Sequence, residues 1–302
     1  MFDRLTKMQF KLGDISEIFV GLQTSADTVF LFKDCERGRQ RTTKVYSKEL
    51  DRHVVLESAL LKPVIRSGEI GRFWAEPTAT VLFPYKITNG KAYLIPEKEM
   101  KEEYPKAWDY LLANKALLSS REHGKFKSSG WYQLYPKNLE RWEQLKIMLP
   151  YMITRLAAFY DDADNYFVNV TTGGFGVVTD PAHGSMKYMT GVFNSALLDW
   201  YLRQVTTNFH GGYFAANKQY IEQLPIRPIN FSNPADKARH DKMVKLVDRM
   251  LELNKQKHSG KLAPSQVERL DREIASTDAE IDELVYELYG ITDEERKIIE
   301  NA

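Results

Sequence analysis

Basic, amide and aromatic side chains gather in three polar segments of the chain, and these residue types suit contact with nucleic acid. Lysine and arginine neutralise phosphates, arginine and glutamine form paired hydrogen bonds to base edges, and aromatic rings stack on bases. In the first segment, residues 33–44, three arginines surround a glycine and a glutamine. The candidate contacts there are Arg37, Arg39, Gln40, Arg41 and Lys44. An ordinary charged hairpin tip is the alternative interpretation.

The second and third segments interleave the same residue types. Residues 121–132 offer the candidates Arg121, Lys125, Lys127, Ser128 and Trp131. Residues 208–218 offer His210, Tyr213 and Lys218, beside paired glycines that permit either close backbone approach to a ligand or a tight bend. For each aromatic ring, packing in the core is the alternative to base stacking. We expect the three segments to converge on one groove-facing surface.

The sequence lacks the motifs of enzymes that act on DNA. An amino-methyltransferase needs a Gly-rich cofactor turn and an Asn/Asp-Pro-Pro-aromatic loop, and neither is found. The glycines of residues 171–176 lack dinucleotide-binding spacing and indicate a hairpin turn. Glu99-Met100-Lys101 is not accompanied by the carboxylates of a metal-dependent nuclease. We therefore predict no catalytic residue, metal ligand or cofactor in this chain, with an activity hidden in a tertiary cluster as the alternative.

Composition and charge restrict the class of protein. The single cysteine excludes an internal disulfide, and no apolar run is long enough to span a bilayer, so we expect a cytoplasmic protein without membrane contact. Residues 1–230 hold 30 Lys and Arg against 25 Asp and Glu, a net of +5. Residues 231–302 hold 12 against 16, a net of −4. A mildly basic body permits a polyanionic partner without requiring one.

Short β-rich runs and helical patterns must position the three polar segments. Strands are expected at residues 15–22, 29–32, 80–85, 148–153, 167–170 and 176–179. Helices are expected around residues 57–62, 104–119 and 190–204. The pattern contains no regular βαβ repeat, so we predict a mixed α/β (α+β) body over residues 1–230.

Residues 231–302 have a helical pattern. Apolar residues recur in steps of three and four over residues 236–256, and a heptad of apolar residues continues from Val267 to Leu288. Gly260 and Pro264 separate the two helices, and Gly290 ends the second before a brief helix that Thr292 caps. We predict an antiparallel, coiled-coil-like helical hairpin, which acts either as a structural buttress or as a partner-binding coil.

The order of these segments resembles the TaqI-like C-terminal specificity domain. This is the target-recognition module of type IIG restriction-modification enzymes and related adenine-specific DNA methyltransferases. The carrying motifs are IFVGLQTSADTVF (residues 18–30), LLKPVI (60–65), LFPY (82–85), WYQL (131–134), YMTGVFNSALL (188–198), GGY (211–213) and YIEQLPI (220–226). The C-terminal hairpin also resembles the coiled helices of restriction specificity subunits.

The resemblance implies that this chain selects a sequence in double-stranded DNA while a separate domain performs the reaction. That methyltransferase domain or subunit acts in cis or in trans and uses S-adenosylmethionine, and a nuclease in some relatives requires magnesium. Two alternatives remain open at this stage. The chain is a type I-like specificity subunit, or it is a protein-interaction scaffold built on its C-terminal hairpin.

Overall fold

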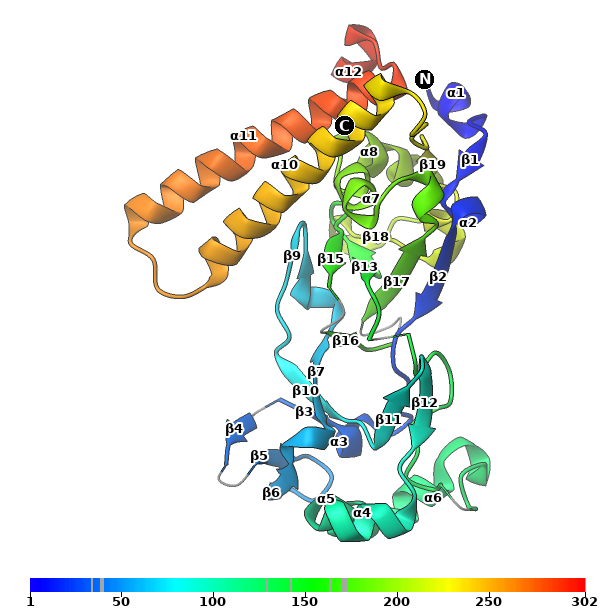
Figure 1. Ribbon diagram of the computed structural model, residues 1–302, viewed down its shortest axis with the longest axis vertical. Coiled ribbons are helices and arrows are strands. Elements are labelled where there is room, and N and C mark those ends of the chain that lie inside the picture. Colours follow the sequence, from blue (N-terminus) through cyan, green and yellow to red (C-terminus); the bar gives the residue numbers. More distant parts are fainter. Residues whose placement is uncertain are drawn as a thin grey trace.

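The computed structural model describes residues 1–33, 35–38, 41–128, 130–141, 143–162, 165–169 and 173–301, and within these ranges not the side chains of Arg37, Ser67 and His210. The chain forms an elongated body from whose upper half two long C-terminal helices project (Figure 1). Helices and strands follow one another irregularly along the body. The predicted mixed α/β class with two long C-terminal helices is confirmed.

An antiparallel sheet lies at the centre of the upper half, with the strand order β15-β13-β17-β2. Its strands are β2 (Ser16–Val20), β13 (Lys146–Pro150), β15 (Phe159–Asp161) and β17 (Gly174–Thr179). Helices α7 (Met186–Phe193) and α8 (Ala196–Val205) lie beside it (Figure 1). Ser185 and Ser195 begin these helices, because their hydroxyls accept hydrogen bonds from the N–H groups three residues ahead.

A second sheet, with the order β16-β7-β10-β3, lies in the lower half. Its strands are β3 (Leu31–Phe32), β7 (Leu61–Ile65), β10 (Ala79–Leu82) and β16 (Tyr166–Phe167). Strand β16 runs parallel to β7, and the other pairs are antiparallel. Beside this sheet lie a three-stranded sheet and a two-stranded one, made of β4 (Cys35–Arg37), β5 (Thr42–Ser47) and β6 (Arg52–Glu57), and of β11 (Tyr85–Thr88) and β12 (Lys91–Leu94).

Short strand pairs and helices complete the body. The pairs are β1 (Phe10–Lys11) with β19 (Pro225–Ile226), β8 (Ile70–Gly71) with β9 (Trp74–Ala75), and β14 (Met152–Ile153) with β18 (Phe214–Ala215). The remaining α-helices of the body are α1 (Phe2–Thr6), α2 (Leu12–Ile15), α3 (Asp27–Phe30), α4 (Glu97–Glu103), α5 (Pro105–Ala113), α6 (Lys115–Gly124) and α9 (Lys218–Ile221). Single 3-10 turns are η1 (Ser58–Leu60), η2 (Ser67–Glu69), η3 (Pro181–His183) and η4 (His210–Gly212).

The two C-terminal helices, α10 (Pro234–His258) and α11 (Pro264–Tyr289), run beside each other and are called the helical pair below (Figure 1). Ion pairs cross between them from Arg249 to Glu273 and from Lys257 to Asp271, which is the order of antiparallel helices. Gly290 ends α11 in the left-handed conformation, and Thr292 caps α12 (Asp293–Glu300), as the sequence predicts. Of the helices in the described ranges, none is both long enough and apolar enough to cross a membrane.

Buried side chains form two hydrophobic clusters. One cluster joins the upper sheet, α7 and α8 to the helical pair through residues such as Val192, Met243 and Ile281. The other fills the lower half. At the contact between α7 and α10, a Cβ on Gly191 would lie 2.3 Å from the sulfur of Met243, so the helices approach as closely as glycine allows. Residues on both sides of the boundary predicted at residue 231 therefore share one hydrophobic core.

Element positions differ from the sequence patterns in several places. The helix expected over residues 104–119 is two helices, α5 and α6, separated at Asn114, and residues 29 and 30 of the strand expected at 29–32 belong to α3. The helix expected around residues 57–62 is wrong, because these residues end β6, form the single turn η1 and begin β7. The helix expected over residues 190–204 is two helices, broken at Asn194 and Ser195. Of the glycine-rich segment 171–176, residues 171 and 172 lie outside the described ranges. Gly174 begins β17, where a Cβ would lie 2.0 Å from the Leu149 carbonyl oxygen, so close strand packing requires this glycine.

Candidate functional site

Three cations line a hollow of about 250 Å³ beside the sheet β4-β5-β6, and we call it the cationic hollow. Its cations are Lys33, Lys48 and Arg66, and Asp27 and Thr28 of α3 complete its polar lining. Lys33 and Lys48 are exposed, and neither forms an ion pair with any residue in the described ranges. An unpaired ammonium group that remains in water is available to a phosphate.

Strand ends bring the two lysines together. Lys33 directly follows β3, and Lys48 directly follows β5. At the end of β5 the buried Ser47 hydroxyl lies 3.1 Å from the Tyr110 hydroxyl, and Tyr110 donates to the carbonyl of Val29 in α3 at 2.8 Å. These contacts hold α3 against β5. The hollow is therefore built on backbone that these contacts hold in place, and the lysine side chains are exposed.

Arg66 is held more firmly than the lysines. Its Nε donates to Glu69 Oε1 at 2.8 Å, and its Nη2 donates to Thr78 Oγ1 at 2.6 Å. Burial alone would raise the pKa of Glu69, but hydrogen bonds from Thr78 and Arg66 keep that pKa below its ordinary value. Glu69 is thus ionised at neutral pH and neutralises most of the Arg66 charge. Lys33 and Lys48 supply the other positive charges of the cationic hollow, which the Asp27 carboxylate offsets in part.

In the segment predicted from residues 33–44, β4 pairs antiparallel with β5, whose end at Ser47 directly precedes Lys48 of the cationic hollow. The backbone of Arg37 ends β4, and Arg41 is exposed with a φ of 59°. Lys44 of β5 forms an ion pair with Glu36 across the two strands, at 3.2 Å. Arg39 and Gln40 lie outside the described ranges, as does the side chain of Arg37. The structure thus confirms a hairpin at this position, and its contact role stays a prediction.

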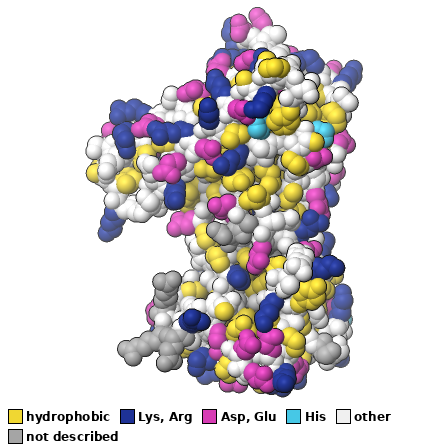
Figure 2. All heavy atoms as spheres, in the orientation of Figure 1, with side chains coloured by type: hydrophobic (Ala, Val, Ile, Leu, Met, Phe, Trp, Pro, Cys, Tyr) yellow, Lys and Arg dark blue, Asp and Glu magenta, His cyan; other side chains and the backbone are white. Residues whose placement is uncertain are grey.

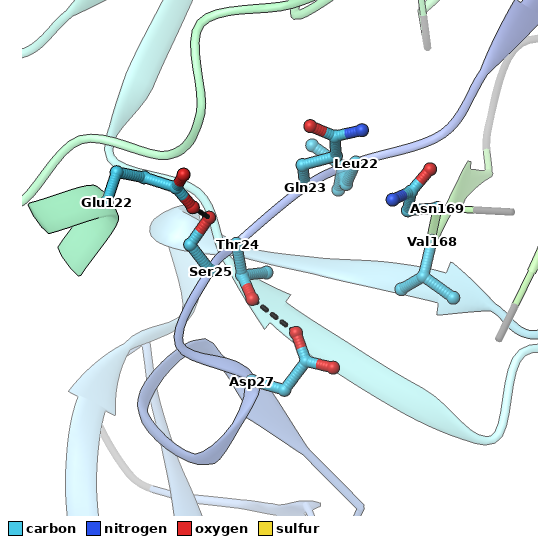
Figure 3. Close-up of a pocket in the computed structure, with 8 residues that line it drawn as sticks. All are labelled: Leu22, Gln23, Thr24, Ser25, Asp27, Glu122, Val168 and Asn169. Atoms are coloured by element: carbon cyan, nitrogen blue, oxygen red, sulfur yellow. Dashed lines mark hydrogen bonds between the residues drawn. The ribbon is translucent and has the colours of Figure 1, made fainter. Parts of the chain in front are cut away.

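A second hollow, of about 300 Å³, lies where residues 22–27 pass residues 168 and 169 (Figure 3). Its lining is polar, and the amides of Gln23 and Asn169 lie on one side of it. On the other side, Ser25 donates to Glu122 Oε1 at 2.7 Å, and Thr24 donates to Asp27. Asp27 lines both hollows, so the two adjoin. Sequence reasoning singled out neither these amides nor Lys48 and Arg66.

Arg121, predicted as a DNA contact, lies in the interior instead. Its guanidinium donates to the carbonyls of Leu118, Thr24, Trp131 and Gln133 at 2.6–2.9 Å. The group also lies 4.5 Å from the ring centroid of Phe126. Burial lowers the pKa of Arg121 to about 10, so it remains charged at neutral pH. In this structure Arg121 links backbone segments, and all its nitrogens are occupied.

The remaining candidates of residues 121–132 divide between core and surface. Trp131 is buried and packs on Trp108 with ring centroids 5.6 Å apart, so the alternative of core packing holds for it. Lys125, Lys127 and Ser128 are exposed, and the Lys125 ammonium lies 4.8 Å from the ring centroid of Tyr135. A left-handed run from Glu122 to Gly124 interrupts the helical conformation at the end of α6, directly before these exposed residues.

The third segment belongs to the upper half. Its tight bend is η4, where Gly211 and Gly212 have φ values of 80° and 78°. Tyr213 is 43% exposed, and Lys218 is exposed at the start of α9. Of His210 only the backbone, in η4, is described. Strand β18, which directly follows Tyr213, pairs with β14, and neither Tyr213 nor Lys218 lines the cationic hollow.

The three segments do not converge as the sequence analysis predicted. In Figure 1 the β4–β5 tip lies at the left edge of the lower half, α6 and the turn after it lie at the right edge, and β18 lies in the upper half. Each segment has its own local anchor, because β5, Thr24 and β14 are different parts of the fold. Only the first segment adjoins a described cluster of unpaired cations.

Comparison with known proteins confirms the resemblance inferred from the motifs. Residues 82–226 match the family model described as the TaqI-like C-terminal specificity domain. The chain is also 24% identical over 250 residues to the type II restriction enzyme and methyltransferase RM.Eco57I of Escherichia coli. The aligned part covers 76% of this chain but only 24% of that protein. The matched range contains Arg121 and the third segment, and it begins after the residues of the cationic hollow.

Proposed function

We propose that this chain recognises a specific sequence in double-stranded DNA as the target-recognition part of a restriction-modification enzyme. The match of residues 82–226 to a specificity domain carries the proposal. The similarity to a restriction enzyme and methyltransferase supports it, and the chain spans about a quarter of the length of that relative. Catalysis belongs to a separate methyltransferase domain or subunit, present in cis or in trans.

In this proposal the cationic hollow anchors the duplex backbone. Lys33 and Lys48 neutralise phosphates, which fixes position but gives no sequence information. The β4–β5 tip then lies next to the bound backbone, where Arg41 and its neighbouring arginines reach into a groove and read guanine edges. The amides of Gln23 and Asn169 are suited to adenine, because an amide offers a donor and an acceptor together.

The reaction that this recognition directs is adenine methylation. With the duplex held, the target adenine would rotate out of the stack toward the partner's pocket, and S-adenosylmethionine held there would be the methyl donor for its exocyclic amine. Any cleavage would be performed by a nuclease domain with magnesium. The chain's own residues contribute positioning in each case.

A second candidate function is a protein-interaction scaffold, as in a type I-like specificity subunit that docks catalytic subunits. The projecting helical pair favours it (Figure 1). Deleting residues 231–302 would not separate the two functions, because Met243, Val247 and Ile281 belong to the upper core and their removal would expose it. Substitution of exposed side chains on the pair is the appropriate alternative.

Salt-dependent duplex binding tests the proposal. We expect Lys33→Ala with Lys48→Ala to weaken binding to all duplexes. The negative slope of log affinity against log salt should become shallower by about 2, one unit for each phosphate contact that is lost. Fluorescence anisotropy with labelled duplexes at low ionic strength measures both quantities. Lys91→Ala with Lys98→Ala is the matched control, since both lysines are exposed and form no ion pair with described residues. An unchanged slope in the first variant would remove the cationic hollow from the interface.

A further inference from the structure

Charge is divided unequally between the two long helices. Helix α10 holds seven Lys and Arg against four Asp and Glu, a net of +3. Helix α11 holds two against eight, a net of −6. The net acidity of the C-terminal region therefore belongs to α11 and α12, and α10 is basic. In Figure 1, α10 is the helix of the pair that faces β9, and α11 lies on the outer side.

The distal half of α10 turns a free cation toward the body. Lys255 lines a hollow of about 570 Å³ together with Trp74, Pro77 and Tyr160. His258 stacks on Trp74 with ring centroids 4.0 Å apart and an interplanar angle of 23°, which fixes the end of α10 against β9. Arg249 and Lys257 are neutralised by α11, but within the described ranges Lys255 and Lys261 have no ion-pair partner.

This hollow and the cationic hollow are parts of one surface. Residues 73–77 line the first hollow, and Ala79 lines the second. Between them, Thr78 accepts a hydrogen bond from Arg66, which itself lines the cationic hollow. Figure 2 shows the molecular outline indented between the helical pair and the lower half on this side. Unpaired lysines thus line both hollows: Lys255 lines the first, beside the carboxylates of Glu76 and Asp162, and Lys33 and Lys48 line the second.

We propose that the helical pair forms the second wall of the duplex-binding surface, with Lys255 and Lys261 on one strand's phosphates and Lys33 and Lys48 on the other's. The inference rests on the proposed function and adds to it a contact outside the body. Duplex DNA is the partner that fits, because it presents phosphates on two sides while the acidic α11 would repel it from the outer face. A basic protein partner would be attracted to the acidic α11 instead.

The interface at the end of α10 is tested with Lys255→Ala combined with Lys261→Ala, where Lys261 belongs to the connection between α10 and α11. We expect duplex affinity to fall at least about 10-fold at 0.1 M salt. The slope of log affinity against log salt should also become shallower by about 2, because two phosphate contacts are lost. The control is Arg272→Ala combined with Lys297→Ala, which removes two exposed cations from α11 and α12 and should leave binding unchanged. Thermal unfolding of both variants should match the parent chain, since none of the four side chains is buried or ion-paired with described residues.

The outcomes separate this inference from the proposed function. If the parent chain binds duplexes and the α10 variant binds them equally well, the second wall is refuted and the recognition role stands. If the parent chain shows no duplex binding even at low salt, the recognition role itself fails. Equal losses in the α10 variant and the control would also overturn the inference, because they would indicate nonspecific attraction to the whole molecule.

Discussion

The guanidinium of Arg121 joins three stretches of backbone in the lower half, around Leu118, Thr24 and residues 131–133. Its five N–H groups suit this task because they point in fixed directions and cannot be deprotonated at neutral pH. Four carbonyls accept from it, including that of Thr24, whose side chain lines the second hollow. The residue thereby positions a part of the candidate site without reaching its surface.

Replacement of Arg121 should destabilise the fold. We expect Arg121→Met to lower the free energy of unfolding by about 3 kcal/mol or more, because four buried carbonyls lose their donor. Urea denaturation followed by tryptophan fluorescence measures the change, with the exposed Lys127→Met in the same segment as control. Full stability combined with lost duplex affinity would show that Arg121 is a contact after all.

Among the helices and strands, the sequence predicted those whose positions depend on apolar spacing and on residues at helix ends. The spacing of Met243, Leu270 and Ile281 on long helices, and Gly290 and Thr292 at helix ends, placed α10 to α12 within a few residues. The same reasoning mistook residues 57–62 for a helix, since a short apolar run such as LLKPV suits either state until β10 pairs with it. Tertiary pairing decides such segments.

Helix α11 also carries a carboxylate whose ionisation opposes folding. Asp282 accepts the N–H of Ala196 at the start of α8 at 2.7 Å, and burial raises the pKa of Asp282 to about 6. Between the pKa values of the unfolded and folded chains, the folded chain binds the extra proton. The Asp282 contribution therefore stabilises the fold as pH falls from about 6 to about 4, and its charge costs stability above pH 6.

The variant Asp282→Asn should accordingly be more stable than the parent at pH 8, by up to about 3 kcal/mol at 1.36 kcal/mol per pKa unit. The amide oxygen still accepts from Ala196, so the start of α8 is kept. Near pH 4 the two proteins should be equally stable. Urea unfolding at both values of pH checks this, and a variant that is less stable at pH 8 would contradict the burial argument.

On the scale of the whole molecule, the candidate site was the part that sequence could not give. Residue types pointed to the segment between β4 and β5, but Lys48 and Arg66 come near it only through strand pairing and α3. The predicted convergence of three segments failed because each is anchored to a different element. The division of charge between α10 and α11 was hidden in the summed charge of residues 231–302, and only their placement gives it meaning.

Selection from a duplex library with a randomised segment tests whether this chain recognises a specific sequence in double-stranded DNA. The purified chain is incubated with the library at low salt, bound duplexes are recovered over several rounds, and the enriched sequences are read. We predict enrichment of one short sequence. The variant Lys33→Ala with Lys48→Ala should still prefer that sequence at a lower yield, because phosphate contacts carry no sequence information. Recovery of sequences as random as the starting library, despite measurable binding, would contradict it.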